Sequence, residues 1–368
     1  MDTPKVSILI PLYNRIRYAE ECIKSALNQT FQDTEVVIRD DCSTDGVFDF
    51  VREKFSEQIS SGKIKLFRNE KNLGEGGTID KLFHDASGKY VHILHNDDLL
   101  LPNASQHLYE VAEKFQADVV HGSNFLIQDK DEPVTEGTPL RPVTGDQKPV
   151  AETTVMPSDP LARFTEWNEN GTFLDAQYNL FRRDFLLENK IFMSRCRDLS
   201  FFLLLWIMKA GVYVKDPTYF YIRRDAKDSK SNTFSARSIE KFIVHKLKVA
   251  EQLDKVLPEI KFFTICPQAL RLAKLKILAN RHDYTIKETY KDGVTPEIQA
   301  AVENAFRQKF GDAAFYPAML FNWVHVLPTE ENISTAMIKS HESWIYSKKV
   351  CNSGLQEKIS GSTKYQAR

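Results

Sequence analysis

Short apolar runs alternate with amphipathic stretches along the first third of the chain. The runs have the pattern of strands buried on both faces, and the stretches between them carry apolar residues at helical spacing. Strands that alternate with helices at these lengths predict a parallel α/β sheet with right-handed crossovers. The expected strands span residues 6–10, 36–38, 64–67, 90–94 and 118–121, and the expected helices span 18–27, 47–55, 78–86 and 104–115.

This pattern breaks down between residues 128 and 160, where prolines recur and polar residues dominate. We expect an irregular loop there, and a mobile lid and an inert insertion both fit it. Regular spacing then returns. Residues 172–181, 183–188 and 198–210 are expected to be regular, the last as a strongly apolar helix, and 212–214 and 219–222 are expected to be strands.

From about residue 235 the apolar spacing is helical almost to the end of the chain, with lysines on the opposite face. We therefore expect two domains, an α/β domain at residues 1–234 and a helical extension at 235–368 with a disordered tail. A plain bundle is the simplest interpretation of these helices. A dimer interface and a membrane-surface patch stay open, and the oligomeric state is unknown.

Composition narrows the class of protein. With 49 Lys and Arg residues against 50 Asp and Glu, charge gives no reason to expect nucleic acid as a partner. Five scattered cysteines without a Cys-x-x-Cys pair argue against a disulfide framework and a zinc site, and they fit a reducing compartment. The chain opens on a strand pattern without a signal peptide, and no apolar run is long enough to span a bilayer. We expect a cytoplasmic protein, with peripheral contact at the inner face of the membrane left open.

Two pairs of adjacent carboxylates follow expected strands, Asp40-Asp41 and Asp97-Asp98. In parallel sheets ligands bind at the carboxyl ends of the strands, so both pairs fall at the edge where a site is expected. Neighbouring carboxylates are costly unless a positive partner is present, and hard oxygen ligands suit Mg²⁺ or Mn²⁺. Turns and helix N-caps are the alternative explanation for each pair.

Five motifs occur in order along the first part of the chain. They are Val6-Ser7-Ile8-Leu9-Ile10-Pro11-Leu12-Tyr13-Asn14, Asp40-Asp41-Cys42-Ser43-Thr44-Asp45, Asn72-Leu73-Gly74, Ala86-Ser87-Gly88-Lys89-Tyr90, and Asp97-Asp98 followed by Pro102. Together they resemble the family 2 glycosyltransferases over roughly residues 5–231. The resemblance implies a GT-A fold, which is a Rossmann-like, mixed, mainly parallel sheet flanked by helices, and a nucleotide-sugar donor.

The resemblance implies a donor site on the first two motifs. Pro11 and Tyr13 match the end of the first strand, where the nucleotide base packs, and Asn14 is included with them. Asp41 matches the carboxylate that accepts a hydrogen bond from the base. Loop packing for Tyr13 and an Asx-turn for Asp41 are the structural alternatives.

The last motif implies a metal site. Asp97 matches the final acid of an Asp-x-Asp sequence, which binds the Mn²⁺ or Mg²⁺ that bridges the diphosphate. His95 stands where the first acid is usual; imidazole can contact a ribose hydroxyl or bind Mn²⁺. Asn96 and Asp98 complete the predicted donor site, and Asp98 is expected to orient neighbours or to cap the next helix.

Two further departures from the family pattern are Cys42, in place of a glycine, and Ile79-Asp80, in place of Arg-Asn. Asp198 lies ahead of an apolar helix, where the family often has Glu-Asp, and is therefore predicted to be the catalytic base. A helix N-cap is the alternative for it.

A second set of residues matches the family pattern less closely. Tyr221, Arg223, Ser229 and Ser231 belong to a loosely similar stretch, in which Arg223 or Arg224 would contact the diphosphate. A solvated surface pair explains the arginines equally well. Stacking on a sugar and core packing are both open for Trp167.

The leading hypothesis is an inverting, metal-dependent glycosyltransferase of the hexosyltransferase type, working in cell-surface polysaccharide synthesis. It would use a UDP- or dTDP-linked donor and a hydroxyl of a glycan or lipid-linked acceptor. The alternative is a catalytically impaired nucleotide- or glycan-binding protein on the same scaffold. A dinucleotide-dependent oxidoreductase is suggested only by Gly74-Glu75-Gly76-Gly77, where Ile79 occupies the place of the third glycine.

Overall fold

The computed structural model describes residues 3–128, 133–135, 137–144, 150–170 and 176–224, together with isolated positions and short stretches between 248 and 277. The chain divides into two compact units, Met1–Asn232 and Thr233–Arg368. Each unit is described by itself, and the first one contains all the candidate site residues.

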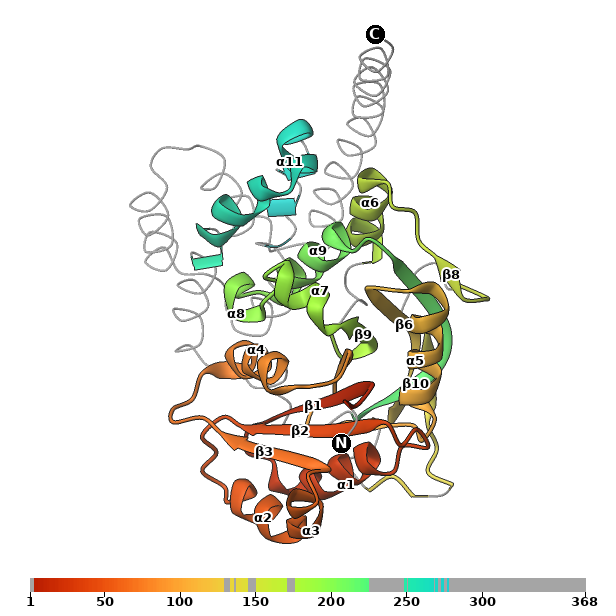
Figure 1. The fold of residues 1–368 in the computed structure, drawn as a ribbon. Coiled ribbons are helices and arrows are strands. Elements are labelled where there is room, and N and C mark those ends of the chain that lie inside the picture. Colours follow the sequence, from red (N-terminus) through yellow and green to blue (C-terminus); the bar gives the residue numbers. More distant parts are fainter. Residues whose placement is uncertain are drawn as a thin grey trace, which may run out of the picture. The chain divides into compact units, whose positions relative to one another are not determined.

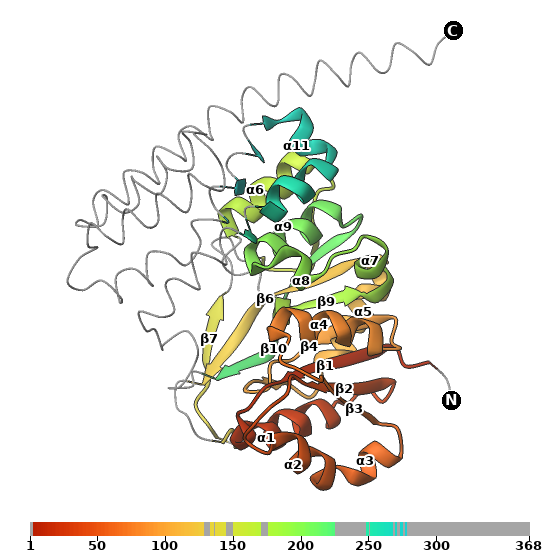
Figure 2. The same cartoon turned by 90° about the vertical axis from the view of Figure 1, so that its left-hand side faces the viewer.

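Four parallel strands form the first half of the sheet, in the order β3-β2-β1-β4. Successive residues of a strand face opposite sides of the sheet, and both sides are covered by helices (Figure 1). Helices α1 and α2 lie on one side and α4 on the other in both ribbon views (Figure 2). These elements are β1 (Val6–Leu12), α1 (Ile16–Leu27), β2 (Thr34–Asp40), α2 (Val47–Lys54), α3 (Ser56–Ser60), β3 (Ile64–Arg68), α4 (Gly74–Asp85) and β4 (Tyr90–Ile93).

The second half of the sheet is mixed, and the full order is β3-β2-β1-β4-β9-β6-β10-β5. Strand β9 runs antiparallel to both β4 and β6, whereas β10 runs parallel to β6. The expected Rossmann-like, mixed and mainly parallel sheet flanked by helices is confirmed. The added elements are β5 (Leu99–Leu100), α5 (Ala104–Phe115), β6 (Val119–Gln128), η1 (Ala176–Tyr178), β9 (Asn179–Arg182), α7 (Arg183–Glu188), α8 (Met193–Cys196), α9 (Leu199–Lys209) and β10 (Tyr213–Arg224).

Several expected boundaries were wrong for reasons connected with proline. Strand β1 continues through Pro11, and β10 is one strand in place of two, with register shifts around Pro217. The stretch expected to be an irregular loop contains β7 (Arg141–Thr144), which pairs with β6, and β8 (Thr154–Val155), which pairs with β10. Pro142 is tolerated in β7 because, among the described residues, this strand pairs with β6 alone, so that no second ladder there needs its missing N–H.

A buried helix, α9, packs in the core of the domain next to the second half of the sheet. Helix α9 is apolar on all sides, and its residues 200–207 are buried. It packs against α6 (Pro160–Asn170), where the Trp167 indole Nε1 donates a hydrogen bond to the Ser200 carbonyl at 3.1 Å. Trp167 is fully buried, so of its two open roles the structure supports core packing and excludes stacking on a sugar.

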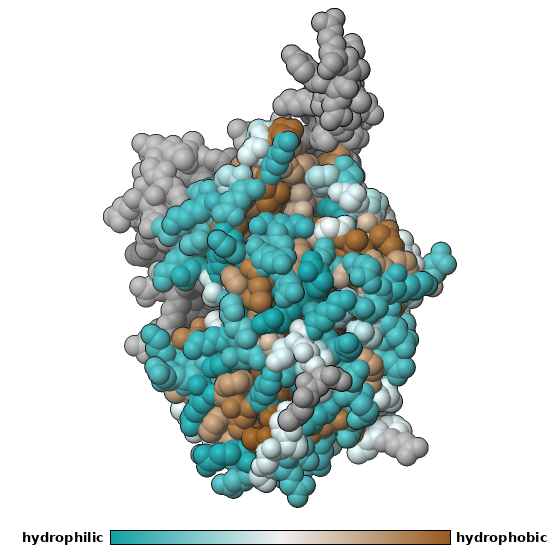
Figure 3. Space-filling view, viewed as in Figure 1, coloured by the Kyte–Doolittle hydropathy of each residue, from teal (hydrophilic) through white to brown (hydrophobic). Residues whose placement is uncertain are grey.

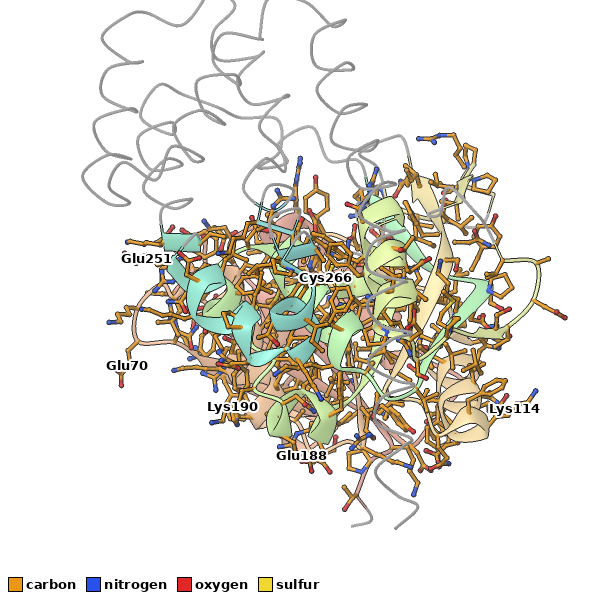
Figure 4. All side chains as sticks on the ribbon, turned by 90° about the horizontal axis from the view of Figure 1, so that it is seen from above. Glu70, Lys114, Glu188, Lys190, Glu251 and Cys266 are labelled. Atoms are coloured by element: carbon orange, nitrogen blue, oxygen red, sulfur yellow. The ribbon has the colours of Figure 1, made fainter. Side chains whose placement is uncertain are left out.

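Polar side chains cover most of the face of the molecule seen in Figure 3, and hydrophobic residues gather there in several small patches. Glu70, Lys114, Glu188 and Lys190 project outward from the first unit (Figure 4). None of the helices that the structure describes has the length and apolar character needed to cross a membrane.

The second unit is described only in part. It contains η3 (Leu257–Glu259) and α11 (Lys261–Ile265), and the other helices expected after residue 235 lie outside the described residues. Cys22, Cys42 and Cys196 are free thiols, whereas Cys266 is disulfide-bonded.

Candidate active site

Three loops meet at the carboxyl ends of β1, β2 and β4, and Asn14 connects them. Its backbone N–H donates to Ser43 Oγ at 2.8 Å, and its Oδ1 accepts from the Thr44 N–H at 3.0 Å. The Asn96 side-chain amide donates to the Asn14 carbonyl at 3.2 Å. The structure therefore brings Asn14 and Asn96 together, with the partly exposed Tyr13 beside Asn14 in the chain.

The two carboxylates after β2 have different environments. Asp40 is fully buried, forms an ion pair with Arg68 Nε at 3.0 Å, and accepts from the Ser43 N–H. Asp41 is 3% exposed, and its Oδ1 accepts from Asn69 Nδ2 at 2.9 Å and from the Leu73 N–H at 2.7 Å. The Asx-type contact foreseen as an alternative for Asp41 is thus made by Asp40, while Asp41 holds the loop that leads into α4.

Cys42 has φ 61°, in the left-handed region. A residue with a Cβ is disfavoured there by about 1–2 kcal/mol, and glycine avoids that cost. This explains why the family pattern has a glycine at a position where this chain has cysteine.

The carboxylates after β4 also differ. Asp98 is 3% exposed; its Oδ2 accepts from the Tyr221 hydroxyl at 2.7 Å and its Oδ1 from the Arg224 N–H at 2.9 Å. Burial, reinforced by the charge of Asp97, raises the pKa of Asp98 to about 6. Asp98 orients the end of β10, as foreseen, but it does not cap the next helix, because the N-cap of α5 is Asn103.

The Asp97 side chain is 21% exposed, more than that of Asp98, and it forms an ion pair with Arg15 Nη1. His95 Nε2 lies 3.2 Å from Glu75 Oε1, in the first turn of α4. The His95 backbone N–H donates to Tyr221 Oη at 3.3 Å, and the Cys22 thiol donates to the His95 carbonyl at 3.3 Å. The two members of the motif therefore meet partners from other loops.

Within the described residues, no group of three or more His, Cys, Asp or Glu side chains could hold a metal ion. Mg²⁺ and Mn²⁺ sites that also contain substrate phosphates need only one or two protein carboxylates. A partly exposed carboxylate at a strand end meets that requirement, so Asp97 fits such an ion when the phosphates come with the substrate.

The two arginines at the end of β10 have separate roles. Arg224 is buried, forms an ion pair with Glu21 at 2.6 Å, and stacks 4.8 Å above the Tyr18 ring. Arg223 is partly exposed, with its guanidinium 5.4 Å from the centre of the Phe125 ring. Arg224 is thus a packing residue, so of these two arginines Arg223 is the one that stays a candidate for the predicted diphosphate contact. Residues 225–231, with Ser229 and Ser231, lie outside the described residues.

Asp198 is the N-cap of α9, and its Oδ1 accepts from the Phe201 N–H at 3.3 Å. It is partly exposed. The preceding helix α8 is attached to α4 by Asp80, whose carboxylate accepts from the Met193 N–H at 2.7 Å and the Ser194 N–H at 2.9 Å. Helix α4 therefore connects the turn that contains Asp198 to the His95 loop, through Asp80 and Glu75.

Comparison with known proteins identifies the family. Residues 7–188 match the family model described as "Glycosyl transferase family 2". The chain belongs to the family 2 glycosyltransferases. Proteins named as glycosyltransferases also match most of its length. A protein named Glycosyltransferase GlyG from Streptococcus pneumoniae is 26% identical over 78% of this chain and 93% of its own.

Two more proteins extend the comparison of this glycosyltransferase. A protein named Cholesterol galactosyltransferase from Borreliella burgdorferi is 26% identical over 88% of this chain and 90% of its own. The crystal structure of S. aureus TarS 1–349 in complex with UDP-GlcNAc superposes with a TM-score of 0.56 at 19% identity, over 83% of this chain and 80% of that one. At this identity the likeness shows the shared fold.

Sequence reasoning missed three residues of this glycosyltransferase's site: Arg15, Glu75 and Asp80. Asp80 had been noticed only as a departure from Arg-Asn, and its position on the buried face of α4 was the available signal. Arg15, just before α1, and Glu75, in the first turn of α4, reach partners that are distant in the sequence, so no local pattern indicates them.

Proposed function

We infer that residues 1–234 form a domain that transfers a sugar with inversion from a UDP- or dTDP-linked donor to a hydroxyl of a glycan or lipid-linked acceptor. The observation that carries this proposal is the meeting of three strand-end loops at Asn14, beside the partly exposed Asp97. The UDP-GlcNAc bound by TarS and the lipid hydroxyl implied by the name Cholesterol galactosyltransferase support the two substrate classes. Such transfers build cell-surface polysaccharides.

In this proposal the donor binds along the three loops. The base packs beside Pro11 and Tyr13, and Asp41 accepts from it through Oδ2, because its Oδ1 already accepts from Asn69 and Leu73. Asp97 would hold Mn²⁺ or Mg²⁺, and a dication bound there would supply positive charge next to the leaving diphosphate.

The acceptor is activated on the opposite side of the sugar. Asp198 takes the proton from the attacking hydroxyl, as inversion requires a base on the face away from the leaving group. Asp80 fixes the turn that contains this base, through its two hydrogen bonds to α8. Arg223, His95, Asn96 and Asp98 complete the proposed donor site.

Thermal denaturation with UDP or dTDP, with and without Mn²⁺, tests the donor site. A ligand at one hundred times its Kd adds about 2.7 kcal/mol of stability, which such scans resolve. We expect Asp97→Asn to remove the Mn²⁺-dependent part of the shift and leave the fold intact, because an amide is a poor partner for a hard dication. The matched control is Asp49→Asn, an exposed α2 acid that also pairs with an arginine, Arg52. An unchanged Mn²⁺-dependent shift in Asp97→Asn would show that Asp97 is only a turn residue.

One observation favours the binding-protein alternative. His95 occupies the position where the family has an acid, and its imidazole contacts Glu75. A protein that had lost activity with that acid would bind the nucleotide but leave the donor intact. Release of UDP from UDP-sugars in the presence of Mn²⁺ distinguishes the two, since a transferase hydrolyses or transfers the donor sugar.

A further inference from the structure

Arg15 forms an ion pair with Asp97, the residue proposed to hold the divalent ion. The two side chains are 16% and 21% exposed, so the pair is largely shielded from solvent. The carboxylate proposed for a metal is therefore already neutralised by a cation of the chain itself.

The backbone around Arg15 is held in an unusual conformation. Asn14 and Arg15 have φ of 56° and 61°, both left-handed, a conformation that asparagine tolerates but that costs about 1–3 kcal/mol at Arg15. Hydrogen bonds on both sides maintain it: Asn14 contacts Ser43 and Thr44, and the Ile16 N–H donates to Asp45 Oδ2 at 2.9 Å. The fold thus fixes the place from which the guanidinium reaches Asp97.

A divalent ion and Arg15 compete for the same carboxylate. When the ion binds Asp97, the guanidinium loses this ion pair next to an incoming diphosphate. Guanidinium groups bind phosphate oxygens through two parallel N–H donors, and they do so better than they bind water. The displaced arginine therefore has a new partner within the same site.

We propose that Arg15 is a diphosphate-binding residue that neutralises Asp97 in the empty site and moves to the donor diphosphate when a divalent ion binds Asp97. This inference rests on the proposed donor site. It assigns to Arg15 two opposing effects, since the side chain weakens the binding of the ion alone and strengthens the binding of the nucleotide.

Arg15→Asn separates the effects, because asparagine tolerates the left-handed conformation and has no charge. Calorimetry with Mn²⁺ alone is expected to show about 2- to 5-fold tighter binding, which corresponds to a released ion pair of modest strength. Calorimetry with UDP at saturating Mn²⁺ is expected to show roughly 10- to 100-fold weaker binding, the usual value of a charged hydrogen-bonding partner. Arg52→Asn, which removes the arginine of an exposed pair on α2, should change neither affinity.

Arg15→Lys provides a second measurement. Lysine keeps the charge but not the paired donors, so we expect wild-type Mn²⁺ binding and only partial recovery of UDP affinity. If either affinity is unchanged in Arg15→Asn while the wild-type protein binds UDP, the inference is overturned and the donor site stands. A wild-type protein that binds no UDP or dTDP with Mn²⁺ overturns the donor site and this inference together.

Discussion

Asp198 combines two roles that a single substitution can separate. As the N-cap of α9, it accepts a hydrogen bond from the Phe201 N–H at 3.3 Å. Asparagine is as good an N-cap as aspartate, so Asp198→Asn should keep this bond and the stability of the domain within a few tenths of a kcal/mol. Asp198→Ala removes the cap as well, which costs about 1 kcal/mol and lowers the Tm by roughly 2–4 °C in a domain of this size.

The effect on chemistry should be much larger than the effect on stability. A positioned general base contributes roughly 10²- to 10⁴-fold to the rate, equivalent to about 3–5 kcal/mol of activation free energy. The amide of Asp198→Asn cannot take a proton from the acceptor hydroxyl. We therefore expect transfer to fall by that factor in both variants, although only Asp198→Ala loses stability.

Three measurements decide the matter: the transfer rate, the affinity for UDP with Mn²⁺, and the Tm. Asp198→Asn should change the first alone, and Asp184→Asn, an exposed acid in the first turn of α7, should change none of them. Transfer near the wild-type rate in Asp198→Asn would refute the reasoning and leave Asp198 as a helix cap. Glu166 would then be a poor substitute, because it is largely buried and forms an ion pair with Lys215; Asp175 lies outside the described residues.

Two further predictions concern histidines. His95→Asp should keep or raise transfer, because a carboxylate there restores the usual acid; a folded variant without any transfer would contradict this. Burial lowers the pKa of His92 from 6.5 to about 4, so the unfolded chain binds more protons between these pH values and stability falls as the pH falls through that window. By pH 4 this lowers the free energy of unfolding by about 3 kcal/mol. Urea unfolding at several pH values should show a shallower loss in His92→Gln, and an equal loss would disprove the assignment.

The strength of the local signal decided which elements could be predicted. Helices α5 and α7 have the expected bounds, because their apolar spacing is regular from end to end. Helix α4 begins at Gly74, four residues before the expected start. The early start could not be predicted because glycine has a low intrinsic helix propensity. The packing accounts for Gly76: a Cβ there would lie 3.2 Å from Met193 Cβ, a tight contact that would require α8 to move by a few tenths of an ångström.

The sequence predicted where the candidate site lies, but it did not predict the burial and the partners of each side chain in it. Adjacent acids after β2 and β4 had to meet at one edge, because parallel strands end there. The sequence could not show that Asp98 is buried against Tyr221 while Asp97 is partly exposed beside Arg15. That difference depends on which way each side chain points and on strands that pair from the distant second half of the domain.

Backbone strain distinguishes the donor loops from the rest of the described structure. Six non-glycine residues of the described structure as a whole have positive φ. Gln116, Lys190 and Arg197 lie at the C-terminal ends of helices, where the chain commonly adopts this conformation. The other three, Asn14, Arg15 and Cys42, all lie in the loops after β1 and β2. Strain persists only where surrounding contacts maintain it, and here the hydrogen bonds of Asn14 and Ile16 do so. The strained backbone therefore lowers the stability of the domain at the place where a fixed geometry would help to bind a diphosphate. This strain is one reason for proposing that Arg15, which follows the Tyr13-Asn14 motif, has a role in the site.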